Sequence, residues 1–185
     1  MKQLKTKLKK NKVNSKKNFK IAIIMGSEND LEVMNGAAHI LEDFNVPFEI
    51  MVVSAHRTPQ WMYDFAKEAE SKKIEIIIAG AGGAAHLPGM VAAMTPLPVI
   101  GVPVRSKAMN GLDSLLSIAQ MPKGVPVATV AVDNSANGAL LAIRILSLHD
   151  SELKKKLNHY HDKQTKKALK SNKTLKMKKN ILDNL

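Results

Sequence analysis

Apolar and polar positions along the chain follow two alternating periods. Short apolar runs predict β-strands at residues 21–25, 48–53, 74–79, 99–101 and 125–132. Between these runs, apolar residues recur at helical spacing and predict helices at about 31–44, 60–71, 87–94, 112–119 and 136–149. Several of the strand runs are almost continuously apolar, as expected for strands that are covered on both faces. The pattern therefore predicts a doubly wound three-layer α/β/α sandwich around a parallel sheet.

The polar segments at the two ends divide the chain into three parts. Residues 1–18 are rich in Lys and Asn, with little apolar periodicity, and we expect a disordered basic extension. Residues 19–149 form the expected folded domain. In residues 150–185, Leu153, Leu157 and Tyr160 recur at helical spacing, which predicts an extra C-terminal helix. Beyond about Ala168 we expect this helix to pass into a frayed basic tail.

The net charge of +12 comes from the two ends of the chain. Residues 1–20 contain nine Lys and no acid, and residues 150–185 contain eleven Lys and four acids. The segment between them is mildly acidic, with eight Lys and Arg against twelve Asp and Glu. This distribution argues against a nucleic-acid-binding face on the domain. The basic ends alone are suited to weak, salt-sensitive contacts with polyanions.

The chain has no Cys, which excludes disulfides, thiolate metal sites and a Cys nucleophile. The absence of Cys also fits a reducing compartment. The longest apolar runs, such as residues 74–81, are too short to span a bilayer, and no apolar segment of a signal peptide follows the basic start. We therefore expect a cytoplasmic protein with no membrane partner.

Polar residues that directly follow the predicted strands are the first candidates for a ligand site, because ligands bind at the carboxyl ends of parallel strands. Gly26 permits a sharp turn after the first strand, and Ser27 places a hydroxyl beside the amides of a helix N-terminus, which suits an anion. The carboxylate of Asp30 suits paired sugar hydroxyls. The same residues also fit a simple helix cap, and both interpretations stay open.

A second candidate group follows the second strand. Ser54, His56 and Arg57 bring a hydroxyl, an imidazole and a guanidinium together within four residues. Arg57 can bind a phosphate through two hydrogen bonds, and His56 can give or take a proton near neutral pH. Thr58 and Pro59 fit the cap and first turn of the next helix. A His–Arg pair on an ordinary surface would look the same in sequence.

The third predicted strand is followed by a run of small residues, from Gly80 to Gly89. Such residues let a ligand approach the backbone and expose amide groups to it. The run does not fit a dinucleotide-binding fingerprint, because Ala85 stands where that pattern needs Gly. A plain flexible loop is the alternative interpretation.

Five stretches of sequence, in order along the domain, carry a joint pattern. They are Met25–Asp30, Val53–Pro59, Ile78–Met90, Leu97–Val104 and Leu112–Pro122. Together they resemble the class I 5-(carboxyamino)imidazole ribonucleotide mutases, over nearly the whole domain from about Lys20 to His149. Residues 19–149 would then be the catalytic domain, with a flavodoxin-like fold. The implied activity is an isomerase reaction of purine biosynthesis, without metal, ATP or organic cofactor.

The resemblance also implies roles for single residues. His56 should carry the proton, Ser27, Ser54 and Arg57 should hold the phosphate of a ribonucleotide substrate, and Asp30 should bind the ribose. Gly82, His86 and nearby loop amides should face the carboxylate that migrates from the exocyclic nitrogen to ring carbon C4. The same match places Ala55, Ala81 and Leu87 in the substrate-binding set.

These roles agree with elementary chemistry. The carbamate nitrogen must gain a proton and C4 must later lose one, and an imidazole with a pKa of about 6.5 can do both in sequence. Released CO2 is neutral and weakly held, so a tight pocket of small residues should keep it beside the ring. The six His residues show no zinc-type cluster, and we expect no metal site.

Two other functions compete with this one. A related carboxylase adds free CO2 to aminoimidazole ribonucleotide with a similar fold and site, although the residues 54–59 and 118–122 favour the mutase. A non-catalytic nucleotide-binding module would not need His56 beside Arg57. The resemblance further implies a homo-octamer with shared sites, and small-residue stretches such as Met90–Met94 are suited to close contacts between subunits. Leu153 and Leu157 would then reach over a neighbouring subunit; the alternative is that their helix folds back on its own subunit.

Overall fold

The computed structural model describes residues 21–182, and the extension expected at 1–18 lies outside them. The strands are β1 (Ile21–Met25), β2 (Phe48–Val52), β3 (Ile76–Gly82), β4 (Val99–Val104) and β5 (Ala128–Thr129). The helices are η1, a short 3-10 helix (Glu28–Asp30), α1 (Leu31–Phe44), α2 (Pro59–Glu68), α3 (Leu87–Ala92), α4 (Leu112–Ala119), α5 (Ser135–Leu146) and α6 (Ser151–Leu182).

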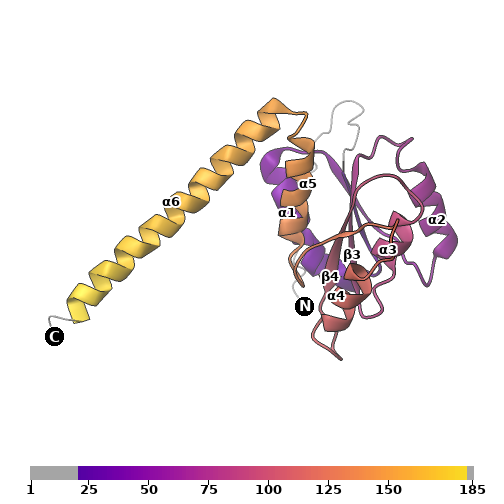
Figure 1. Ribbon diagram of the computed structural model, residues 1–185, viewed down its shortest axis with the longest axis horizontal. Coiled ribbons are helices and arrows are strands. Elements are labelled where there is room, and N and C mark those ends of the chain that lie inside the picture. Colours follow the sequence, from indigo (N-terminus) through magenta and orange to yellow (C-terminus); the bar gives the residue numbers. More distant parts are fainter. Residues whose placement is uncertain (1–20, 183–185) are drawn as a thin grey trace, which may run out of the picture.

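The five strands form one sheet in the order β2-β1-β3-β4-β5, and every neighbouring pair is parallel. This is the flavodoxin-like order, in which the chain reverses direction across the sheet between β1 and β3. The predicted parallel α/β sandwich is therefore confirmed. Figure 1 shows the sheet in the middle of the domain, with α1 and α5 at one side and α2 at the other.

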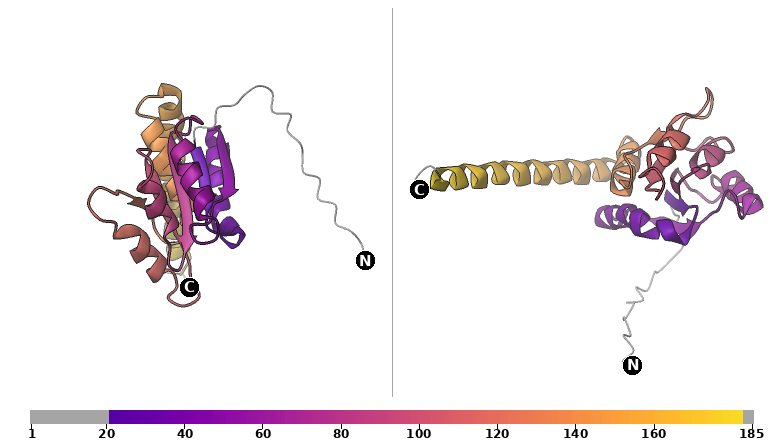
Figure 2. Two further views of the ribbon diagram at one scale, coloured as in Figure 1. Left: turned by 90° about the vertical axis from the view of Figure 1, so that its right-hand side faces the viewer. Right: turned by 90° about the horizontal axis from the view of Figure 1, so that it is seen from below.

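Alternation along β1 shows how the sequence builds two cores, one on each face of the sheet. Ile21, Ile23 and Met25 pack in the core that α1 and α5 cover. Ala22 and Ile24 point to the other face, into the core covered by α2, α3 and α4. Because successive strand residues face opposite ways, a strand with two covered faces must be apolar throughout. Figure 2 shows the layers from two further directions.

Strand bounds differ from the prediction where Gly and Pro are present. β3 continues through Gly80, Ala81 and Gly82, which the sequence placed in a loop, and these residues pair with β4. β4 continues past Gly101 through Pro103, whose carbonyl accepts a hydrogen bond from the backbone of Asp133. β5 is only two residues long instead of eight. Both strands that lengthen do so at the edge of the sheet where ligands bind in this fold.

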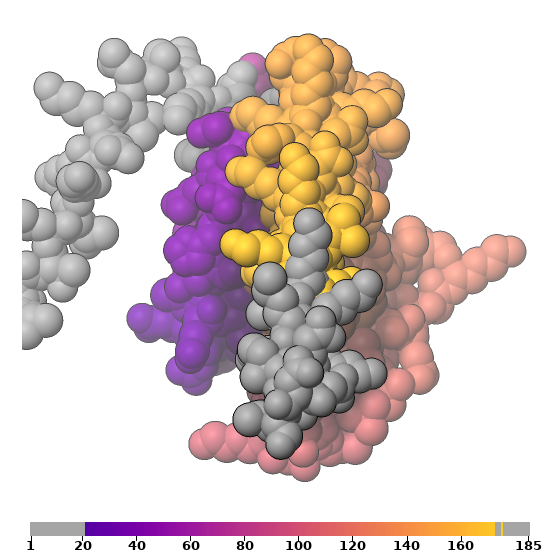
Figure 3. Space-filling model, turned by 90° about the vertical axis from the view of Figure 1, so that its left-hand side faces the viewer, coloured from indigo at the N-terminus to yellow at the C-terminus, as the bar shows by residue number. Residues whose placement is uncertain are grey.

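Helix α6 differs most from the sequence prediction. Leu153 is buried, and Leu157 and Tyr160 pack beside it against the core under α1 and α5. The ring of Tyr160 lies 5.6 Å from that of Phe44, and Lys156 Nζ donates to the Phe44 carbonyl oxygen at 2.7 Å. The apolar residues at the start of α6 therefore pack on their own domain, so the expectation that they reach over a neighbouring subunit was wrong. Figure 3 shows this side of the molecule.

Beyond His161, whose ring is hydrogen-bonded to Arg144 of α5 at 2.9 Å, the helix leaves the domain. All side chains from His161 to Asn172 are exposed, and α6 continues past Ala168, where a frayed tail was expected, to Leu182. Figures 1 and 2 show it as a long arm that extends away from the sheet. Within residues 21–182, no helix is both long and apolar enough to cross a membrane.

Candidate active site

The loops after β1, β2, β3 and β4 meet at one edge of the sheet and enclose a cavity of about 440 Å³. All ten residues proposed from the sequence line it: Ser27, Asp30, Ser54, Ala55, His56, Arg57, Ala81, Gly82, His86 and Leu87. The structure thus brings together residues that are up to 60 positions apart in the sequence. They come from the carboxyl ends of three adjacent parallel strands, which is where this type of sheet binds ligands.

The loop after β1 places a buried carboxylate in the cavity. Ser27 Oγ accepts a hydrogen bond from the backbone of Asn29 at 3.3 Å, so it caps helix η1 as the simpler interpretation proposed. Its side chain also lines the cavity, so the cap and the site use the same residue. Asp30 is buried, and burial raises its pKa above the ordinary value of 3.8, although a backbone hydrogen bond from Ser27 and the charge of Arg57 oppose this.

The loop after β2 is held by hydrogen bonds around Ser54. Arg57 donates to Ser54 Oγ from its backbone N–H and from Nε, at 3.3 and 3.2 Å, and Arg57 Nη2 donates to the Gly26 carbonyl at 2.6 Å. The guanidinium therefore ties the β1 and β2 loops together. Thr58 occupies the N-cap position of α2 and Pro59 its first turn, as predicted, but the Thr58 hydroxyl donates to the carbonyl of Ser54 rather than capping the helix.

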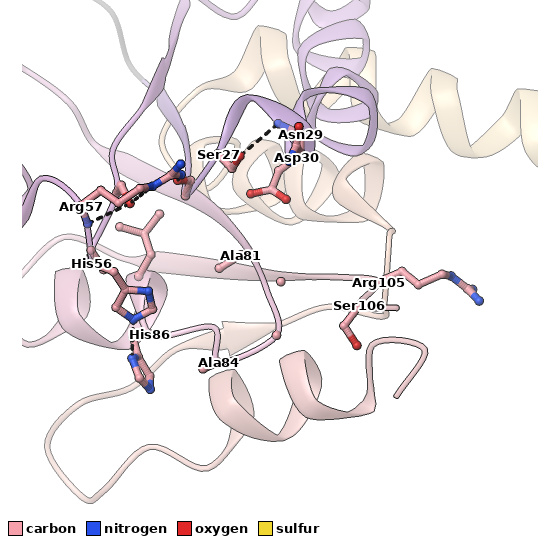
Figure 4. Close-up of a pocket in the computed structure, with 16 residues that line it drawn as sticks. Ser27, Asn29, Asp30, His56, Arg57, Ala81, Ala84, His86, Arg105 and Ser106 are labelled. Carbon is pink, nitrogen blue, oxygen red and sulfur yellow. Dashed lines mark hydrogen bonds between the residues drawn. The ribbon is translucent and has the colours of Figure 1, made fainter. Parts of the chain in front are cut away.

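Two imidazoles meet at the far side of the cavity. His56 Nε2 and His86 Nδ1 are 2.7 Å apart, with their rings almost perpendicular. At this distance one nitrogen donates its proton to the other, so the protonation of one ring fixes the tautomer of its partner. Figure 4 shows the two rings pointing toward each other, across the cavity from Ser27 and Asp30. The two imidazoles are therefore coupled by one hydrogen bond at the edge of the cavity.

The wall between these groups consists of small residues. Ala55 and Ala81 are buried, Gly82 is exposed to the cavity, and Leu87 is buried at the start of α3. An added Cβ at Gly82 would meet the backbone oxygen of Val104 at 3.4 Å, so a side chain here would have little room. The small residues of this wall leave space for a ligand beside the backbone.

Six further lining residues were absent from the sequence-based set: Gly26, Asn29, Gly83, Ala84, Arg105 and Ser106. Arg105 donates from its backbone N–H and Nε to the Asp133 carboxylate at 2.8 and 3.1 Å, and in Figure 4 its side chain extends away from the cavity. Arg105 and Ser106 directly follow β4. The strand-end rule would have found them had the end of β4 been placed at Val104 rather than Gly101.

Within residues 21–182, no group of three or more His, Asp or Glu side chains is arranged to hold a metal ion. The chemical groups that the cavity does offer include two imidazoles, the guanidinium of Arg57, one buried carboxylate and several hydroxyls. This set is suited to a phosphorylated sugar and to proton transfer.

Comparison with known proteins agrees with this chemistry. The family model described as AIR carboxylase matches residues 20–167, which is most of the chain. The chain belongs to the AIR carboxylase family. An N5-carboxyaminoimidazole ribonucleotide mutase from Pyrococcus horikoshii is 65% identical over 140 residues, covering 76% of this chain and 79% of the relative. The corresponding mutase from Saccharolobus solfataricus is 62% identical, covering 77% of this chain and 90% of the relative.

The AIR carboxylase family also includes larger relatives. The phosphoribosylaminoimidazole carboxylase of Saccharomyces cerevisiae is 59% identical over 149 residues, which cover 80% of this chain but 26% of the relative. Among solved structures, that of Treponema denticola PurE superimposes with a TM-score of 0.77 at 29% identity, covering 84% of this chain and 97% of the other. Similarity in sequence and in fold thus extends over the same domain.

Proposed function

We propose that the chain converts N5-carboxyaminoimidazole ribonucleotide to 4-carboxy-5-aminoimidazole ribonucleotide, an isomerase reaction of de novo purine biosynthesis. One observation carries this proposal: all ten residues proposed from the sequence line a single cavity in a member of the AIR carboxylase family. Relatives that are named as the mutase match this chain over about four fifths or more of their own length.

The proposed course needs one proton carrier. The C–N bond of the carbamate breaks, CO2 leaves, and the electron pair stays on nitrogen, which takes a proton from the His56 imidazolium. Ring carbon C4 then attacks CO2, a C–C bond forms, and the C4 proton returns to the neutral imidazole. Atoms and charges balance, and His56 ends in its starting state. His86, 2.7 Å away, would hold the ring of His56 in the required orientation.

The polar groups at the other side of the cavity would bind the ribose phosphate. Arg57 is fixed by Ser54 and by the Gly26 carbonyl, so its charge is held in place before the ligand arrives. Ser27 and Ser54 add hydroxyls to this corner, and Asp30 would accept hydrogen bonds from the ribose. Gly82 and neighbouring amides would then face the carboxylate group.

Direct carboxylation is the second candidate. The observation that favours it is the 55–59% identity of fungal and plant relatives named as the carboxylase. In those relatives the matching segment is about a quarter of the whole protein, whereas the mutases are of similar length to this chain. The length of the match therefore favours the mutase reaction.

The deciding experiment supplies the pure protein with each substrate in turn, without metal or ATP. We expect the protein to convert the carboxyamino substrate at low bicarbonate. The absorbance of the C4-carboxylated product measures this conversion. Aminoimidazole ribonucleotide with bicarbonate should react far more slowly at the same concentrations. Faster turnover of aminoimidazole ribonucleotide would establish the carboxylase instead, and no turnover of either would refute both.

For assembly, we propose a homo-octamer in which neighbouring subunits cover exposed apolar side chains near the site. Val52 and Trp61 are each 46% exposed and line a second hollow that shares Ser27, Ser54 and Arg57 with the cavity. Large apolar side chains next to a ligand site are a common feature of subunit contacts. Light scattering should give eight times the 20.2 kDa of one chain, and an active monomer would exclude this assembly.

We also propose that the protein acts in the cytoplasm. The complete absence of Cys from the 185 residues fits a reducing compartment, in which disulfides contribute little to stability. Cell fractionation with an antibody against the chain tests this placement, and recovery in a membrane or secreted fraction would contradict it.

A further inference from the structure

Ser114 is a fully buried hydroxyl for which the proposed chemistry has no use. It lies in the first turns of α4, within the stretch Leu112–Pro122 that was part of the family resemblance but supplied no site residue. α4 packs against β3 and β4 near the carboxyl ends of these strands. A buried polar group in such a place needs hydrogen-bond partners, and its partners indicate its purpose.

The hydrogen bonds of the Ser114 hydroxyl reach the cavity wall at Gly83 and the end of β4 at Val104. Its Oγ donates to the carbonyl of Val104 at 2.6 Å and accepts from the backbone N–H of Gly83 at 2.8 Å. Val104 and Gly82 form the last pair of the β3–β4 ladder. The hydroxyl therefore extends the hydrogen bonding between the two strands by one step, because it joins Gly83, the residue after β3, to the end of β4.

Gly83, which donates to the Ser114 hydroxyl, has an unusual backbone conformation. Gly83 has φ of 67°, in the left-handed region, and with Gly82 and Ala84 it lines the cavity. From there the chain turns into His86, whose backbone N–H donates to the Ala84 carbonyl at 2.9 Å. Because His86 contacts His56, the position of Gly83 also influences the pair of imidazoles.

Asp113, the residue before Ser114, anchors the other loop of the cavity. Its Oδ1 accepts from the hydroxyl of Ser106 at 2.7 Å and from the backbone of Ser114 at 3.0 Å. Ser106 Oγ in turn accepts from the backbone of Met109. The Asp113–Ser114 pair thus fixes the loops after β3 and after β4 from one helix terminus.

We propose that Ser114 is a positioning residue that keeps the Gly82–Ala84 wall closed, so that the CO2 released in the reaction is captured by C4 before it escapes. This inference rests on the proposed mutase function. CO2 has no charge by which the protein could hold it, so retention depends on the shape of the wall. A wall that loosens should release CO2 and leave aminoimidazole ribonucleotide behind.

The test is Ser114→Ala, assayed for the ratio of two products. Each turnover ends either in the C4 carboxylate or in free aminoimidazole ribonucleotide plus CO2, and spontaneous decay of the substrate is subtracted. We expect the variant to raise the fraction lost as free aminoimidazole ribonucleotide at least about fivefold, with a smaller fall in total substrate consumption. Added bicarbonate should restore part of the yield, because recapture then competes with escape.

Two other serines provide matched controls. Ser117 lies on the same helix and donates to the carbonyl of Asp113 at 2.7 Å, and Ser135 is 1% exposed and donates to the carbonyl of Val33. Neither of them contacts Gly83 through a hydrogen bond in the described structure. Ser117→Ala and Ser135→Ala should therefore keep the wild-type product ratio, even where the melting temperature falls.

Gly83→Ala provides a second way to disturb the same wall. An added Cβ would meet no atom within 4 Å, so the substitution strains the backbone at positive φ without a clash. We expect it to raise the released fraction as Ser114→Ala does, and it can be assayed if Ser114→Ala does not fold. A wild-type product ratio in the folded variants would overturn the proposal.

Exchange of the Gly83 amide hydrogen separates this inference from the proposed function. In Ser114→Ala this amide should exchange faster by about tenfold or more, because its acceptor is gone. Faster exchange in a protein without any mutase activity would refute the proposed function while it supports the role of Ser114 in holding the loop. Unchanged exchange would refute that role.

Discussion

The rim of the cavity and the outer part of helix α6 contrast in what determines their structure. At the rim, His56 and Arg57 follow the edge strand β2, and hydrogen bonds join their loop to the loops after the buried strands β1 and β3. In α6, every side chain from His161 to Asn172 is exposed, so the helix there depends mainly on local propensity rather than on packing. The contrast teaches that the position of a site residue depends on packing elsewhere in the domain. Substitutions in the exposed part of a helix should have much smaller effects.

The largest expected effect is at the rim. His56→Asn should lower kcat about 100-fold or more, the usual scale for loss of a general acid–base, while binding and melting temperature change little. His159 on α6 is exposed, and His159→Asn is the matched control with no expected change. Near-normal turnover of His56→Asn in a steady-state assay would show that another group carries the proton.

The next effect compares two leucines of one helix. Leu153 is 6% exposed and belongs to the core, whereas Leu169 is 57% exposed. Leu153→Ala should lower the free energy of unfolding by about 2–5 kcal/mol, and Leu169→Ala by less than about 0.5 kcal/mol. Urea titrations of both variants measure the difference. Equal losses would show that the outer part of α6 packs against something after all, such as a neighbouring subunit.

A smaller effect concerns Asp30 and pH. Burial raises the pKa of this carboxyl above 3.8, so the folded state favours the neutral form. Its contribution to stability is fully present below pH 3.8 and is lost as pH rises through the raised pKa. Asp30→Asn should therefore be more stable than the wild type at neutral pH and lose this advantage in acid, although it should bind substrate less well.

Urea titrations of the Asp30→Asn variant and the wild type at several pH values give this difference directly. A stability advantage that grows as the pH falls would have the wrong sign and would contradict the raised pKa.

The smallest effect is expected from the removal of residues 168–185. The family match ends at residue 167, and the described side chains just before and after it are exposed. The shortened protein should keep its melting temperature within about 2 °C and its turnover within about twofold. A large loss of activity, measured beside the full-length chain, would give the arm a role in catalysis or assembly.

Much of the fold and the site could be predicted because it depends on local patterns. Continuous apolar runs such as Ile21–Met25 indicated the parallel sheet, and the strand-end rule placed His56 and Arg57 in the cavity. Arg105 and Ser106 were missed because Pro103 made the end of β4 look earlier than it is. Proline is uncommon inside a strand, so the local signal was misleading.

Other features depend on contacts that sequence alone does not reveal. Thr58 is a residue type that often caps helices through its side chain, but its hydroxyl donates to the carbonyl of Ser54, four residues earlier. Leu153 had no evident partner in sequence, yet it packs in the core beneath α1 and α5. In both cases the competing partner is supplied by the three-dimensional path of the chain.

The length of α6 has a consequence for how the molecule moves in water. The 22 helical residues after Tyr160 span about 33 Å at 1.5 Å per residue, about the width of a small domain. A body with such a projection meets more friction than a sphere of equal mass, and it tumbles slowly about its short axes. Gel filtration would therefore overstate the mass of every assembly state, whereas sedimentation would be slower than the mass suggests. The friction of the arm, compared between the full-length and shortened chains, measures how rigidly α6 extends in solution.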